Sequence, residues 1–104
     1  MIIKILLLIL INYNSQNWES YCQNDVLYVQ GEIKLLKGQY ARLYPINWNS
    51  RQLELKLKIL GEPISFETIN CYPNYIQFNN FQIPSKVIIQ FPNGEQNELR
   101  IFRK

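Results

Sequence analysis

The chain has 104 residues, of which 11 are basic and 8 acidic, and it contains two cysteines and no histidine. This length suits one domain, and the content of Ile, Leu, Tyr and Phe is too high for a disordered chain. The missing histidine removes the commonest general base and metal ligand and excludes Ser-His and Cys-His nucleophiles. The positive charge is small and unclustered, which argues against nucleic acid as a partner.

The first eleven residues predict export. Lys4 precedes the unbroken apolar run 5–11, and a basic start before an apolar core of this length is typical of a secretory signal peptide. A membrane-spanning helix needs about 20 apolar residues, so we expect no stable membrane span. We place cleavage near Ser15, although Tyr13 then occupies a position where a small residue is usual. An uncleaved anchor and a buried N-terminal element are the alternatives.

The expected organisation is a signal peptide at residues 1–15 and a single secreted domain at residues 16–104. In the oxidising secretory pathway Cys22 and Cys71 are expected to form a disulfide. A bridge that closes about 50 residues would stabilise the fold by roughly 4 kcal/mol in the loop-entropy model. Two buried free thiols are the alternative.

Short β-strands account for the rest of the chain. Their signals, in chain order, are Val26–Gln30, Ile33–Leu36, Gln39–Ile46, Arg51–Leu60, Ile64–Ile69, Tyr75–Phe78, Lys86–Phe91 and Leu99–Phe102. Lys37-Gly38 and Pro92-Asn93-Gly94 mark turns.

The clearest strand is Arg51–Leu60, in which Leu53, Leu55, Leu57 and Ile59 alternate with polar residues. Alternation with period 2 indicates a strand with one buried face, which favours antiparallel pairing. The sequence therefore predicts an all-β fold, a small antiparallel β-sandwich of jelly-roll or Ig-like type with seven to eight strands.

Two groups of aromatic residues are candidate binding surfaces. Tyr40, Arg42 and Tyr44 share one face of their strand if alternation holds, and such a stripe can stack on a sugar ring or on a partner's side chains. Tyr72 and Tyr75 flank Pro73-Asn74 in a segment tethered by the expected disulfide. Ordinary sheet packing of these rings is the alternative in both cases.

Catalytic, cofactor-binding and metal-binding residues are not expected. The acids considered for carboxylate chemistry are Glu54, Glu62, Glu67, Glu95 and Glu98, and each is expected at the solvated surface. We therefore expect a secreted, non-enzymatic binding or structural module for an unknown extracellular protein or carbohydrate. The alternatives are an N-terminal ectodomain fragment of a larger surface protein and a small carboxylate-dependent hydrolase.

Overall fold

The computed structural model describes residues 17–49, 51–78 and 84–104. Every regular element in these ranges is a strand, which confirms the expectation of an all-β protein. The strands are β1 (Glu19–Gln23), β2 (Val26–Gln30), β3 (Ile33–Leu36), β4 (Tyr40–Trp48), β5 (Gln52–Leu60), β6 (Thr68–Cys71), β7 (Asn74–Phe78), β8 (Lys86–Gln90) and β9 (Gln96–Arg103). The predicted signal peptide lies outside the described residues, and none of these residues belongs to a helix that could cross a bilayer.

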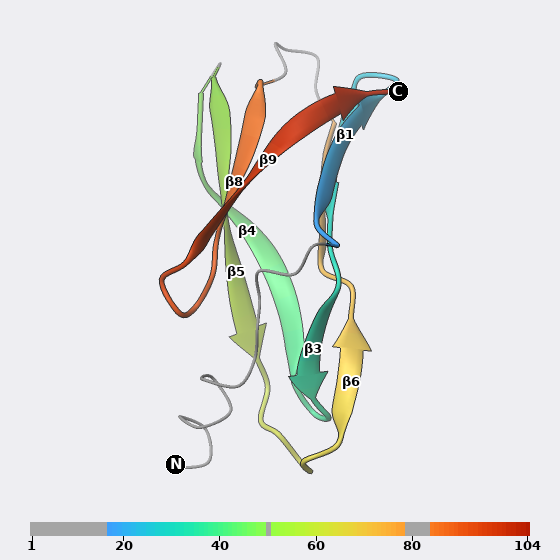
Figure 1. Ribbon diagram of the computed structural model, residues 1–104, viewed down its shortest axis with the longest axis vertical. Coiled ribbons are helices and arrows are strands. Elements are labelled where there is room, and N and C mark those ends of the chain that lie inside the picture. Colours follow the sequence, from blue (N-terminus) through green and yellow to red (C-terminus); the bar gives the residue numbers. More distant parts are fainter. Residues whose placement is uncertain (1–16, 50, 79–83) are drawn as a thin grey trace.

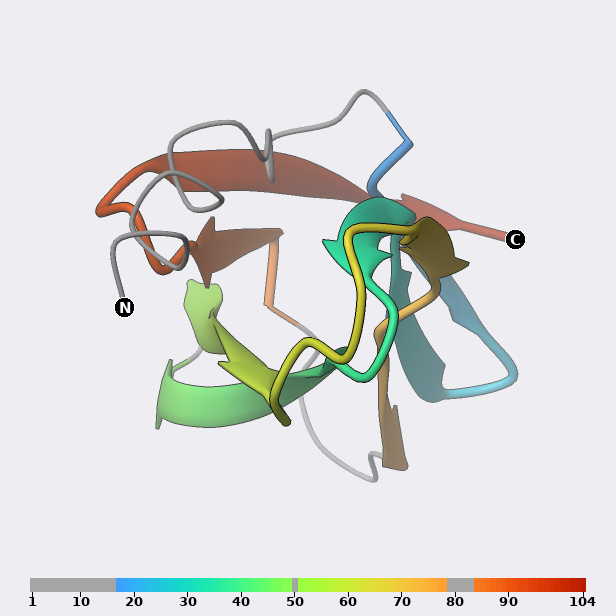
Figure 2. The same ribbon diagram turned by 90° about the horizontal axis from the view of Figure 1, so that it is seen from below.

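One strongly curled sheet dominates the molecule, in the order β4-β5-β8-β9-β1-β2-β7 (Figure 1). Its two edge strands, β4 and β7, approach each other, so the strands surround a common core as a nearly closed barrel (Figure 2). The core cluster consists of Trp18, Leu27, Val29, Ile33, Leu35, Leu43, Leu53, Leu55, Leu57, Val87, Ile89 and Phe91.

The expectation of purely antiparallel pairing is wrong, because β5 pairs with β8, and β1 with β9, in parallel. A sandwich of two facing sheets, whether jelly-roll or Ig-like, is not confirmed. The wall of a barrel and one sheet of a sandwich both bury a single face. An alternating strand pattern is therefore the same in the two architectures and does not distinguish them.

The long pairing of β2 and β3 with β6 and β7 positions the candidate site. Gln30 pairs with Asn74, and Ile33 pairs with Cys71, so both ladders have the same register. The ladder is interrupted only briefly between these pairs, where the Gly31 N–H donates to the Pro73 carbonyl at 3.2 Å. The ribbon of β3 and β6 consequently continues the barrel wall formed by β2 and β7 (Figure 1).

Strand β5 has one buried and one exposed face, as its alternating sequence predicted. Leu53, Leu55 and Leu57 are fully buried, while Lys56 and Lys58 on the opposite face are exposed. Its neighbour β4 extends past Pro45 to Trp48, further than predicted, because a register shift between Pro45 and Asn47 absorbs the proline. A bulge of this kind allows a strand to carry a residue that cannot donate to the ladder.

Both predicted turns are confirmed. Gly38 (φ 100°) follows Lys37 in the turn closed by a 3.0 Å hydrogen bond from the Gln39 N–H to the Leu36 carbonyl. Gly94 (φ 88°) lies in the connection between β8 and β9, which form the expected antiparallel hairpin.

Two elements differ from the expectation. Strand β1 was not predicted; it pairs with β2 through a two-residue connection in which Asn24 and Asp25 both have positive φ (53° and 62°), as a type I′ turn requires. The predicted strand Ile64–Ile69 is wrong for most of its length, because β6 begins only at Thr68. Ile64 is 73% exposed, so the apolar alternation of that segment does not report a buried face.

Candidate functional site

The outer face of β1, β2 and β7 carries two polar rows that cross the strands side by side. Glu19 pairs with Gln30, which pairs with Asn74. Asn17, Glu32 and Tyr72 lie two residues beyond the ends of these strands and form a second row: Asn17 Nδ2 contacts Glu32 Oε2, and the hydrogen bond from the Gly31 N–H to the Pro73 carbonyl brings Glu32 and Tyr72 together. Side chains two positions apart in a strand point to the same side of the sheet, so all six project outward together.

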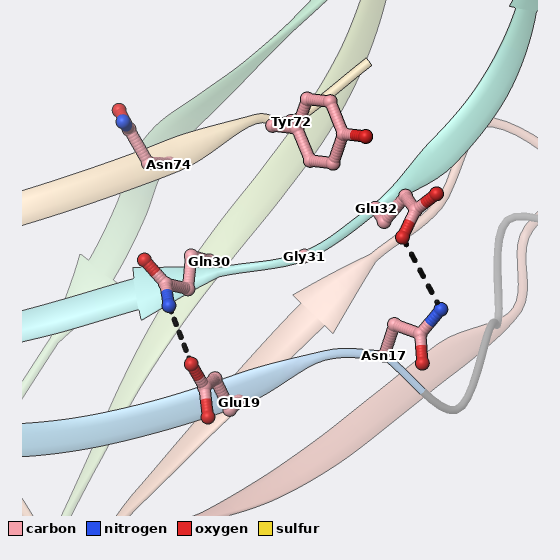
Figure 3. Close-up of a pocket in the computed structure, with 7 residues that line it drawn as sticks. All are labelled: Asn17, Glu19, Gln30, Gly31, Glu32, Tyr72 and Asn74. Atoms are coloured by element: carbon pink, nitrogen blue, oxygen red, sulfur yellow. Dashed lines mark hydrogen bonds between the residues drawn. The ribbon is translucent and has the colours of Figure 1, made fainter. Parts of the chain in front are cut away.

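These rows line an open hollow of about 280 Å³ (Figure 3). Its lining residues are Asn17, Glu19, Gln30, Gly31, Glu32, Tyr72 and Asn74. The hollow contains two carboxylates, three amides and one aromatic ring, and none of the described residues that line it is basic. Its chemistry therefore suits a ligand that donates hydrogen bonds and offers an apolar surface to the ring.

Each carboxylate of the hollow accepts a hydrogen bond from an amide of a neighbouring segment. Gln30 Nε2 donates to Glu19 Oε1, and Asn17 Nδ2 donates to Glu32 Oε2 at 3.5 Å (Figure 3). Each amide–carboxylate pair presents acceptor oxygens beside amide groups that can both donate and accept. Each pair therefore offers both donors and acceptors of the kind that a hydroxyl group uses.

The structure separates the two tyrosines of the predicted binding segment. Tyr72 is 67% exposed and lines the hollow. Tyr75 faces the other side of the sheet, packs against the core, and donates from its hydroxyl to Gln77 Oε1 at 3.1 Å. Burial raises the pKa of the Tyr75 phenol. Only Tyr72 of this pair is therefore available to a ligand in the hollow.

An aromatic row adjoins the hollow on the same face. Tyr21 pairs with Tyr28 on one side and Phe102 on the other, and Tyr28 pairs with Ile76. The Tyr21 and Tyr28 rings stack with centroids 4.9 Å apart, and Lys104 Nζ lies 4.0 Å from the centre of the Tyr21 ring. Phe102 is 61% exposed. The row of Glu19, Gln30 and Asn74 thus lies between this aromatic row and the row of Asn17, Glu32 and Tyr72.

The predicted stripe of Tyr40, Arg42 and Tyr44 lies on a different part of the barrel. All three side chains point outward from β4, whereas Leu43 is buried and Ala41 packs against the core. The alternation assumed from the sequence is therefore confirmed for β4. This stripe and Tyr72 belong to two separate surfaces.

The predicted disulfide is not formed, since Cys22 and Cys71 are both free thiols. Cys22 lies level with Leu27 and Gln77, whereas Cys71 pairs with Ile33 at the other end of the ladder. Six residues separate Cys71 from Gln77, which at about 3.3 Å per residue is roughly 20 Å along the strand direction. A disulfide needs Cα atoms within about 4.4–6.8 Å, so this register keeps the two thiols apart.

Sequence reasoning missed most of the hollow. Glu19 and Glu32 were not among the acids considered, and Asn17 and Gln30 were not considered either. Each residue is unremarkable in its own segment, and the cluster arises only when three strands align. The only local signal was Trp18 and Cys22, which are both buried and lie on the opposite face from Asn17 and Glu19; the buried Ser20 between them hides the alternation.

In the described part of the chain, no three His, Cys, Asp or Glu side chains lie close enough together to hold a metal ion. Comparison with known proteins gives no further guidance, because no family model, curated protein or solved structure matches this chain. The geometry of its own residues is therefore the basis for any functional conclusion.

Proposed function

We propose that this protein is a secreted, non-enzymatic binding module that holds a carbohydrate on the outer face of β1, β2 and β7. One observation carries the proposal: two amide–carboxylate pairs lie side by side, with the exposed Tyr72 ring beside the Asn17–Glu32 pair and the Tyr21–Tyr28 stack beside the Glu19–Gln30 pair. A sugar offers adjacent hydroxyls to such pairs and an apolar ring face to an aromatic side chain.

The exposure of the acids supports binding rather than catalysis. Glu19 is exposed, Glu32 is half-buried, and each accepts a hydrogen bond from an amide of a neighbouring segment. Carboxylate-dependent hydrolysis needs one acid that is shielded from water and therefore stays protonated. We expect the bound sugar to be released unchanged.

Export is part of this proposal. The apolar run after Lys4 supports it, and we expect the mature protein to begin near Gln16. N-terminal sequencing of protein collected from the medium of expressing cells would measure the start of the chain. A product found only inside the cells with Met1 retained would contradict export.

The test of carbohydrate binding is substitution of Tyr72. Tyr72→Ala removes the exposed ring but no core contact, so we expect carbohydrate affinity to fall about tenfold, since one stacked ring contributes on the order of 1.5 kcal/mol. Binding is measured by screening labelled protein on a glycan array and then titrating the best ligand by calorimetry.

Phe66→Ala is the matched control. Phe66 is 71% exposed, close to the value for Tyr72, but it lies at the other end of β6 and does not line the hollow. Its loss should leave affinity unchanged. An array with no carbohydrate ligand, equal losses from both variants, or hydrolysis of a bound glycan would each overturn the proposed function.

A further inference from the structure

A second surface, on the outer face of β4 and β5, carries three cationic side chains. Arg42 of β4 lies directly opposite Lys58 of β5, and Tyr44 lies directly opposite Lys56. The side chains of Arg42, Lys56 and Lys58 are exposed. We call the set Tyr40, Arg42, Tyr44, Lys56 and Lys58 the basic face.

The cations of the basic face lack acidic partners in the described ranges, whereas other cations have them. Lys86 lies 2.8 Å from Glu98, and Lys37 lies 3.6 Å from Glu67. Glu54, the acid on the same side of β5, accepts a hydrogen bond from Gln52 at 2.7 Å. None of the residues in 17–49, 51–78 or 84–104 forms an ion pair with Arg42, Lys56 or Lys58.

The placement of these cations is electrostatically unfavourable. Residues directly opposite in an antiparallel pair have Cβ atoms about 4.5–5.5 Å apart, and like charges at that position destabilise the pair. Arg42 and Lys58 occupy such a position. A bound anion would relieve this repulsion.

The tyrosines hold two of the cations against the sheet. The Arg42 guanidinium carbon lies 5.7 Å from the centre of the Tyr40 ring, and Lys58 Nζ lies 5.1 Å from the centre of the Tyr44 ring. A cation over a ring occupies the face on which a nucleic-acid base would stack, and single-stranded nucleic acids depend on such stacking. The charged groups of Arg42 and Lys58 and the tyrosine hydroxyls can still contact a ligand.

We propose that the basic face binds an acidic polysaccharide, a sugar chain that carries sulfate or carboxylate groups. The Arg42 guanidinium can donate two parallel hydrogen bonds to two oxygens of one such group. Lys56 supplies a further charge two residues along β5 from Lys58, about 7 Å away. This site does not depend on the hollow at Tyr72 and would give the protein a second carbohydrate ligand of different charge.

The experiment titrates the full chain with heparin, using dextran as the uncharged control. The double variant R42Q/K58Q should bind heparin at least about tenfold more weakly, and the slope of log affinity against log salt should fall by about 2. Without ligand this variant should unfold within a few degrees of the parent, because the loss of a like-charge pair offsets the loss of two exposed cation–π contacts.

The matched control is K34Q/R103Q, which removes the same two charges from exposed residues of β3 and β9. It should change heparin affinity by about twofold or less, since it alters only the general field of the protein. Y72A should leave heparin binding unchanged, which separates this site from the hollow. Equal losses in both double variants, no heparin binding by the parent, or tighter binding of single-stranded DNA than of heparin would overturn the proposal.

Discussion

Gly31 shows how one residue connects the core to the candidate site. It lies under the hollow, and a Cβ added at this position would come within 2.3 Å of the Trp18 ring. Trp18 is buried and packs on Phe91 with ring centroids 5.8 Å apart. The indole therefore fills the space beneath β2 because position 31 has no side chain.

Gly31→Ala should consequently lower the free energy of unfolding by about 1–3 kcal/mol, the usual cost of overpacking a well-filled core. Urea denaturation followed by far-UV circular dichroism measures the change in both backgrounds. In the double variant G31A/W18L the smaller side chain leaves room for the methyl group, so the added cost of Gly31→Ala should largely disappear. An equal cost in both backgrounds would show that the contact with Trp18 is not its cause.

At the scale of single elements, β5 determines the packing of the barrel wall. It is the middle one of three paired strands, with β4 on one side and β8 on the other, and its inward side chains pack into the core. Leu53 and Leu55 are completely buried. The same strand presents Lys56 and Lys58 outward, so one period-2 pattern builds both the core and the basic face.

Leu55→Ala should destabilise the protein by about 2–5 kcal/mol, because it removes buried methyl groups and leaves a cavity. Ile46→Ala is the control: Ile46 is 47% exposed and lies at the bulge of β4, so its truncation should cost less than about 1 kcal/mol. Thermal or urea unfolding measures both values. Similar losses for the two variants would contradict the assignment of β5 to the core.

Over the whole molecule, the nearly closed sheet carries two surfaces of opposite character on different strands. The hollow on β1, β2 and β7 carries carboxylates and amides, while the face of β4 and β5 carries Arg42, Lys56 and Lys58. A net charge of +3 does not reveal this division. The curled sheet places the two surfaces on different strands of the wall, so the two proposed ligands would bind independently of each other.

Global stability should fall at alkaline pH. Burial raises the pKa of the Cys71 thiol above its ordinary value of 9.0 and that of the Tyr75 phenol above 10.0. Above pH 9 the unfolded chain therefore loses protons that the folded protein retains, so the free energy of unfolding decreases as the pH rises. The slope from these two groups begins about one pH unit below the ordinary thiol pKa of 9.0 and is negligible near neutral pH.

Urea denaturation from pH 7 to 11 measures this dependence. The double variant C71A/Y75F removes both groups and should have a flatter profile above pH 9 than the parent. If the variant kept the full slope, groups other than Cys71 and Tyr75 would be responsible for the pH dependence.

The sequence by itself determined the local features of this protein. Alternation in 52–59 specifies a strand with one buried face, glycine at 38 and 94 specifies turns, and the spacing of Tyr40, Arg42 and Tyr44 places them on one face. These properties depend on neighbouring residues, because strand period and positive φ are local consequences of side-chain direction and backbone sterics.

Only the tertiary structure decided which strands meet. The parallel pairs β5–β8 and β1–β9, the separation of Cys22 from Cys71, and the hollow formed by residues of three strands all depend on long-range register. A strand pattern states which face is buried but not which strand lies beside it. For that reason Tyr72 could be selected from the sequence. Glu19, Gln30 and Glu32 become its neighbours only through the pairing of β1, β2 and β7.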